Sequence, residues 1–156
     1  MKRIFLLVSL IVTPAAVMLA QTNNNSWIDG DGKWETGTNW STGFAPSLSD
    51  ASDLITNAGN NTVTIDATTS GSYPDSMTIN KLTISAPQFS VNTLQLSNAG
   101  TVTPLLVAGA FLVGQGGSMV IEDSVVESMG TRFQVGGTLT LPSGGAVLAS
   151  AFSFMA

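Results

Sequence analysis

The feature that most constrains this chain is a run of short apolar segments in residues 77–148, separated by glycine, asparagine, serine and proline. Apolar and polar residues alternate within the segments, as at Leu94 and Leu96 and again at Leu139 and Leu141. A period of two puts successive side chains on opposite faces of a β-strand, so that one face can be buried while the other meets water. The pattern predicts strands at residues 53–56, 62–66, 77–85, 89–97, 101–107, 110–114, 118–123, 132–136 and 138–142, with a polar loop between residues 66 and 75.

Three pairs of these segments resemble each other at similar spacings. The pairs are FLVG at 111–114 with FQVG at 133–136, 22 positions apart; GGSMVI at 116–121 with GGTLTL at 136–141, 20 apart; and NKLTI at 80–84 with TPLLV at 103–107, 23 apart. Repeats of about 20 to 23 residues, made of short strands and glycine turns, fall in the range of solenoid units that bury their apolar faces on one another. The sequence therefore predicts an all-β fold, a right-handed parallel β-helix.

An antiparallel β-sandwich is the alternative, because many short strands with frequent turns predict that fold as well. In residues 77–148 no Asn-Gly or Asp-Gly pair joins two strands, and such pairs are the strongest hairpin signals. Their absence favours the β-helix, or solenoid, which we expect in residues 51–156. The apolar stretch from residue 144 onward would form another unit of it.

The first twenty residues have the organisation of a secretory signal peptide. Lys2 and Arg3 precede an apolar stretch at residues 4–12, and small residues follow up to Ala20. The apolar stretch is short for a membrane span, so we expect cleavage after Ala20 and no membrane span in the mature chain, with an uncleaved anchor as the alternative. Residues 1–20 thus predict export, with polar residues 21–25 as a leader.

Composition excludes several functions. Loss of Lys2 and Arg3 with the signal peptide changes the net charge from -5 to -7, and an acidic chain without a basic cluster repels nucleic acid. The chain has no histidine and no cysteine, which removes the commonest neutral-pH base, thiol catalysis and the usual zinc ligands. We therefore predict no catalytic residues and no nucleic-acid partner.

All three tryptophans, Trp27, Trp34 and Trp40, lie within residues 21–50. Exposed indole faces could stack on sugar rings, which would make the three a carbohydrate platform. The other reading is a cap, because the open end of a β-stack exposes apolar side chains and unpaired backbone that something bulky must cover. The cap is the favoured prediction, and carbohydrate stacking is kept as the alternative.

The same region resembles a known family. Its pattern consists of Trp27, Gly32, Trp34, Asn39, Trp40, Gly43, Pro46 and Asp50, followed by a strand and leucine-rich repeats. It is similar to the opening module of bacterial secreted surface proteins with autotransporter-associated β-strand repeats. The resemblance implies an exported, β-helical, passenger-like or adhesin-like body. Such proteins are usually longer and end in a membrane barrel or a sorting tail, so residues 51–156 are expected to be part of a longer stack.

Two groups of acids are candidate sites. Asp29 and Asp31, in DGDG, invite a calcium site, since hard cations take carboxylate and carbonyl oxygens on flexible loops. The EF-hand pattern is excluded because Lys33 and Trp40 occupy its fifth and twelfth places. Glu122, Asp123 and Glu127, with Arg132 beyond them, could serve acid and base steps on a glycosidic bond, but solvated corner residues are the simpler interpretation.

Together these patterns predict an exported, non-enzymatic β-solenoid that acts as a surface scaffold or adhesin. It would be secreted or held at the surface of a bacterium, and polysaccharide or extracellular matrix would be its partner. Calcium is the one cofactor for which the sequence offers residues. The alternative is a carbohydrate-binding or polysaccharide-cleaving β-helix, which requires exposed indoles beside a groove.

Overall fold

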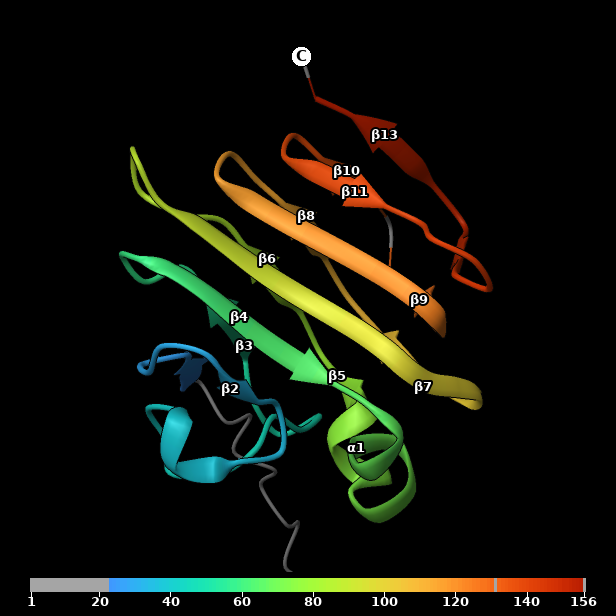
Figure 1. Cartoon of the computed structure of the whole chain (residues 1–156), viewed down its shortest axis with the longest axis horizontal. Helices are drawn as coiled ribbons and strands as arrows, with labels where there is room; N and C mark the ends of the chain where they lie inside the picture. Colours follow the sequence, from blue (N-terminus) through green and yellow to red (C-terminus); the bar gives the residue numbers. More distant parts are fainter. Residues whose placement is uncertain (1–22, 131, 156) are drawn as a thin grey trace, which may run out of the picture.

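The computed structural model describes residues 23–130 and 132–155, so the predicted signal peptide at residues 1–20 lies outside the described residues. The chain is mostly β-strand (Figure 1). Its strands are β1 (Asn24–Ser26), β2 (Gly32–Lys33), β3 (Ser52–Ile55), β4 (Asn60–Ile65), β5 (Thr78–Ile79), β6 (Leu82–Ile84), β7 (Val91–Val107), β8 (Phe111–Val113), β9 (Gly117–Ser128), β10 (Phe133–Val135), β11 (Thr138–Thr140), β12 (Ala146–Ala149) and β13 (Phe152–Phe154). The helical elements are α1 (Ala67–Ser72) and the 3-10 turns η1 (Gly37–Asn39) and η2 (Pro74–Met77).

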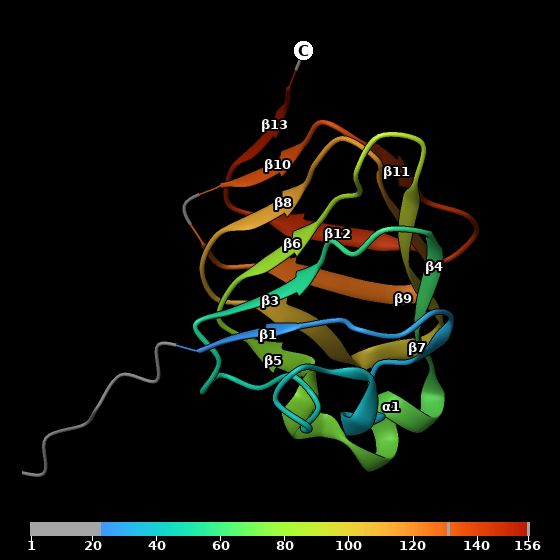
Figure 2. The ribbon, with the colours of Figure 1, turned by 90° about the vertical axis from the view of Figure 1, so that its left-hand side faces the viewer.

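The strands form two sheets. The first sheet has the order β1-β3-β6-β8-β10-β13, and the second has the order β11-β9-β7-β4-β2, with β5 on β7 and β12 on β9. Figure 2 faces the first sheet, and Figure 1 faces the second. Every pair of named strands among the described residues is parallel. The antiparallel β-sandwich alternative is therefore wrong, and the all-β prediction is confirmed.

Two of the three sequence echoes coincide with strand pairing. Phe133 lies beside Phe111 in the first sheet, and Thr138 lies beside Ser118 in the second, at the predicted offsets of 22 and 20. The third echo is wrong. Leu82 pairs with Phe111 in the first sheet, whereas Leu106 pairs with Thr78 in the second, because the predicted strand at 77–85 divides into β5 and β6.

The two longest strands bend. Strand β7 joins the predicted strands 89–97 and 101–107, and β9 extends the predicted strand 118–123 to Ser128. At the bends, Asn98, Gly100 and Asp123 have positive φ angles of 55°, 79° and 43°. Gly has no Cβ to clash there, and Asn and Asp tolerate this conformation better than most residues. The bends let each strand run from one face of the molecule to the next.

The core lies between the sheets and is built from rows of apolar side chains in register. Val63, Leu94 and Met119 form one row across β4, β7 and β9, and each is fully buried. Phe111 and Phe133 stack with ring centroids 4.3 Å apart. Burial alternates along the strands as the period-two pattern predicted, so each strand buries its inner face on its neighbours.

Several elements were not predicted: strand β1, which begins within the predicted polar leader at residues 21–25, strand β2, the two 3-10 turns and helix α1. Residues 66–75 contain helix α1 instead of a polar loop, because Asp66 caps it: its carboxylate accepts from the Thr68 and Thr69 amides, and the Thr69 hydroxyl accepts from the Asp66 amide. Such a capping box fixes the first turn of even a short helix. Within residues 23–130 and 132–155, no helix is long and apolar enough to cross a membrane.

The indoles of Trp27, Trp34 and Trp40 lie inside the end of the molecule that holds β1, β2 and α1. Their exposed fractions are 2%, 0% and 1%. Trp40 packs edge-on against both other indoles, with ring centroids 5.2 and 5.1 Å away. Their Nε1 atoms donate to the backbone oxygens of Gly30, Ser76 and Trp34. Stacking of sugars on these rings is therefore wrong, since no ring face reaches solvent, whereas burial over the end of the core is what a cap requires.

Candidate functional site

The outer face of the second sheet carries polar side chains in rows that cross the strands. One row runs through Thr62, Thr93, Ser118 and Thr138, which are neighbours on β4, β7, β9 and β11. The next row runs through Lys33, Thr64, Gln95, Val120 and Thr140. All nine side chains are partly or fully exposed, while the residues between them point into the core. Alternation along each strand is what gathers these groups on one face.

Two recesses open on this face. The larger, about 450 Å³, is lined by Lys33, Thr64, Asp66, Ala67, Thr68, Gln95, Ser97 and Asn98. The second, about 430 Å³, is lined by Asp31, Gly32, Lys33, Thr62 and Thr64. Lys33 and Thr64 belong to both recesses. We call the two recesses and the two rows the polar track.

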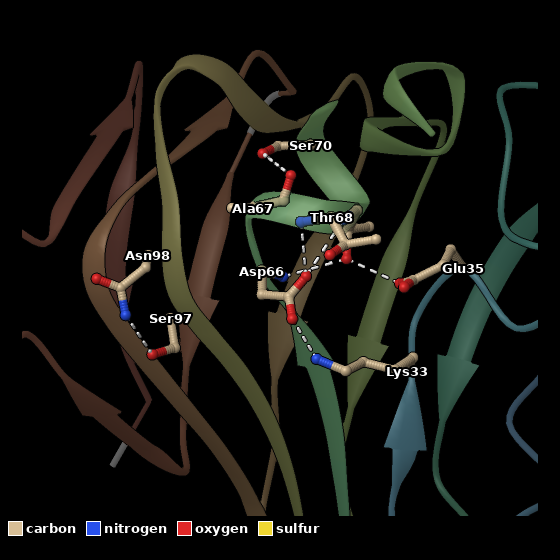
Figure 3. Close-up of polar contacts among 9 residues, drawn as sticks. Lys33, Glu35, Asp66, Ala67, Thr68, Ser70, Ser97 and Asn98 are labelled. Atoms are coloured by element: carbon tan, nitrogen blue, oxygen red, sulfur yellow. Dashed lines mark hydrogen bonds and ion pairs between the residues drawn. The ribbon is translucent and has the colours of Figure 1, made fainter. Parts of the chain in front are cut away.

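Asp66 holds one end of the polar track together (Figure 3). Its Oδ1 accepts from the amides of Thr68 (2.8 Å) and Thr69 (3.3 Å), and its Oδ2 accepts from Lys33 Nζ. The hydrogen bond from Lys33, followed by those two amides, lowers the pKa of Asp66 below its ordinary value. The Thr69 hydroxyl also donates to Glu35 Oε2 at 2.8 Å, which ties the turn at Trp34 and Glu35 to helix α1.

The track offers hydrogen-bonding side chains. The side chains of Thr64 and Gln95 make no hydrogen bond to another described residue, so their hydroxyl and amide groups are available to a ligand. Ser97 is engaged on both sides, since it donates to Glu122 Oε2 at 3.3 Å and accepts from Asn98 Nδ2 at 3.2 Å. The groups can bind a polyhydroxylated or amide-rich molecule.

The calcium prediction gains no support from the placement of Asp29 and Asp31. The Oδ1 of Asp29 accepts from the Gly30 amide at 2.8 Å, and the Oδ1 of Asp31 accepts from the Thr62 amide at 2.7 Å. Among the described residues no three acidic side chains form a group that could hold a metal ion. The Asp29 carboxylate thus bonds within the turn between β1 and β2, and the Asp31 carboxylate joins that turn to β4.

The acids on β9 are spread along a bend. Asp123 lies at the corner with its positive φ, Glu122 precedes it beside Ser97, and Glu127 follows it beside Leu106. The corner therefore places Glu122 and Glu127 on different segments of β9. Arg132 lies beyond the end of this strand and is exposed. No pair of these residues is joined by a hydrogen bond within the described chain.

Sequence reasoning missed Asp53, which lies inside β3 between Asn25 of β1 and Leu82 of β6. Its side chain is fully buried, and neither carboxyl oxygen has a hydrogen-bond partner among the described residues. Burial, aided by the nearby Asp50 carboxylate, raises the pKa of Asp53 to about 8. The sequence held one indication of this burial: Asp53 is two residues from Ile55, so both side chains point to the same, inner face of β3.

The polar track was missed too, although its signal was present. The residues between the apolar positions of each strand, such as Thr64 and Gln95, are hydroxyls and amides, but their alignment depends on register between strands. Comparisons of the chain with protein-family models, with curated proteins and with solved structures give no match.

Proposed function

We propose that this chain is an exported, non-enzymatic surface scaffold of the adhesin-like, passenger type, folded as a right-handed parallel β-solenoid. One observation carries the proposal: along the chain the strands alternate between two parallel sheets, except that β4 and β5, and again β11 and β12, follow one another in the second sheet. Neighbouring strands keep their side chains in register, so that residues facing the same way lie side by side in rows. Such stacking resists local opening because the inner strands of each sheet are paired on both sides. It gives a stiff body with a regular polar exterior.

The cap supports the same proposal. The motif that resembles autotransporter-associated β-strand repeat proteins supplies the three indoles that close one end of the core. Rigid display of polar rows would allow many weak contacts with a polysaccharide or an extracellular matrix, and repeated contacts raise the overall affinity. The place of action would be outside a bacterial cell or on its surface.

The proposal is tested by measuring whether the chain is exported and where it is then found. The chain with a C-terminal epitope tag is expressed in a bacterium, beside a variant that lacks residues 2–20. We expect the tag of the full chain in the medium or open to external protease on whole cells, and the tag of the shortened chain inside the cell. Cytoplasmic retention of both would overturn the proposal. A crystal structure tests the handedness of the solenoid.

Carbohydrate binding is the second candidate, and the polar track favours it. The track replaces the buried indoles as the surface that a sugar could reach. Polysaccharide cleavage has no comparable support, because the acids of β9 are separated by the bend at Asp123.

A further inference from the structure

We propose that the polar track binds a neutral, β-linked polysaccharide chain laid across strands β2, β4, β7 and β9. The inference rests on the proposed function only in that an exported surface protein meets polysaccharides. It adds the site, the residues and the ligand class. The site is the pair of recesses that share Lys33 and Thr64, continued along the two rows.

The repeat of the track is the first argument. Thr64 and Gln95 are register neighbours on adjacent strands, and so are Thr62 and Thr93, so similar groups recur at the strand spacing of about 4.8 Å. An extended β-linked glycan presents its hydroxyl groups with a rise per sugar close to this spacing. A ligand with a short, regular repeat therefore meets a polar side chain on each of β2, β4 and β7, namely Lys33, Thr64 and Gln95.

The chemistry of the groups is the second argument. A hydroxyl such as that of Thr64 both donates and accepts, and the amide of Gln95 offers two donors and one acceptor in one plane. Sugar hydroxyls need this mixture of partners. Val120 follows Gln95 in the same row and gives an apolar contact for the CH groups of a sugar ring. The partly buried setting of Thr64 and Gln95 limits the freedom that they would lose on binding.

Charge decides between neutral and anionic polymers. Lys33 is the one basic residue that lines the two recesses, and the Asp66 carboxylate pairs with it. Asp31 and Asp66 add two acids to the same walls. Since the whole chain carries a net charge of -5, a uronate or sulfate polymer would be repelled, whereas a neutral glycan would not.

Helix α1 sets one limit of the site. Ala67 and Thr68, in its first turn, line the larger recess beside Asp66, and Asn98 lines it from the bend of β7 (Figure 3). The Asp66 hydrogen bonds hold this wall in place. The glycan would lie over β4 and β7 against a fixed edge, which would set its register on the rows.

The experiment is native affinity electrophoresis of the purified protein in gels that contain hydroxyethyl cellulose, arabinoxylan or galactomannan, with carboxymethyl cellulose, which is also β-linked, as the anionic arm. We expect at least one neutral polymer to retard the protein and carboxymethyl cellulose not to. The double variant Thr64→Val with Gln95→Met removes the hydroxyl and the amide while keeping the side-chain volume. Loss of two hydrogen bonds should weaken the apparent affinity about tenfold.

The matched control is Thr83→Val, which makes the same change on β6 in the first sheet, away from the track. Circular dichroism and thermal unfolding confirm that all variants are folded. Retardation by carboxymethyl cellulose alone, equal retardation of the double variant and the original chain, or no retardation by any neutral polymer would overturn the inference. Each of these results would leave the location test of the scaffold proposal unaffected, so the two proposals can fail separately.

Discussion

The two ends of the strand stack differ in how far their apolar side chains are covered. At the end with β1, the Trp34 and Trp40 indoles are buried, and the outward edge of β1 is occupied, since the Ser26 amide donates to Ser41 Oγ and the Ser41 amide donates to the Ser26 carbonyl. Strands β11, β12 and β13 lie at the other end (Figure 2). There the side chains of Phe152, Phe154 and Leu148 are exposed by 43%, 75% and 56%.

The difference shows what strand stacking can and cannot do. Repeating strands bury each other's inner faces, but the last face of a stack needs a segment that does not follow the repeat. Residues 27–50 are that segment at one end, and their sequence is unlike that of the strands. Substitutions in the covered end should therefore lower the free energy of unfolding more than substitutions in the exposed end.

The largest expected effect concerns Asp53, in the covered end. With a folded pKa of about 8 against an ordinary value of 3.8, its carboxyl keeps its proton in the fold while the unfolded chain releases it. The free energy that the protonated Asp53 carboxyl contributes to folding is fully present below pH 3.8 and is lost as the pH rises to about 8. Each pKa unit corresponds to about 1.4 kcal/mol, so the loss should be on the order of 5 kcal/mol.

Asp53→Asn isolates this effect, because an amide stays neutral throughout. Urea unfolding at pH 4, 6 and 8 should show the original chain losing stability relative to the variant as the pH rises. Asp75→Asn, which changes an exposed acid in η2, is the control. Parallel pH profiles for the original chain and Asp53→Asn would mean that Asp53 is ionised in the fold.

The second prediction removes the centre of the cap. Trp34→Ala should lower the free energy of unfolding by about 3–5 kcal/mol, the range for deleting a large buried aromatic side chain. Trp34→Phe keeps a ring in the core but leaves the Ser76 carbonyl without the indole donor, so its loss should be about 1–3 kcal/mol. Chemical denaturation measures both. A loss below 1 kcal/mol in Trp34→Ala would show that the indole does not seal the core.

The positions of the strands and their buried faces could be predicted from the sequence. Which strands pair, and which side chains they enclose, depends on the register between strands. Alternation predicted strands and their buried parity, as at Leu94 and Leu96, because a pleat fixes which face a residue takes. The third echo, between residues 80–84 and 103–107, was wrong because residue similarity does not say which sheet a strand joins. Asp53 was missed because a buried carboxyl is rare, and only its neighbours show that it is enclosed.

The third prediction concerns the helix that closes the polar track beside the cap. Asp66→Ala removes the acceptor of the Thr68 and Thr69 amides and the partner of Lys33, and should cost about 1 kcal/mol. Asp66→Asn keeps an oxygen for the amides and loses the exposed ion pair, so its effect should be under about 0.5 kcal/mol. Thermal unfolding at neutral pH compares the two variants. Equal losses would mean that charge, and not capping, holds the helix.

The smallest effect is expected at the exposed end. Phe154 packs edge-on against Phe152 at 5.0 Å but remains 75% exposed, so Phe154→Ala should change the free energy of unfolding by less than about 0.5 kcal/mol. Phe152→Ala should cost more, because Phe152 also packs against Phe133 at 5.0 Å. Unfolding at two protein concentrations measures both. A loss in Phe154→Ala as large as that in Trp34→Ala would contradict the contrast between the ends. If that loss also grew with concentration, the ring would have to be covered by a second molecule, since only then does burial depend on how many copies are present.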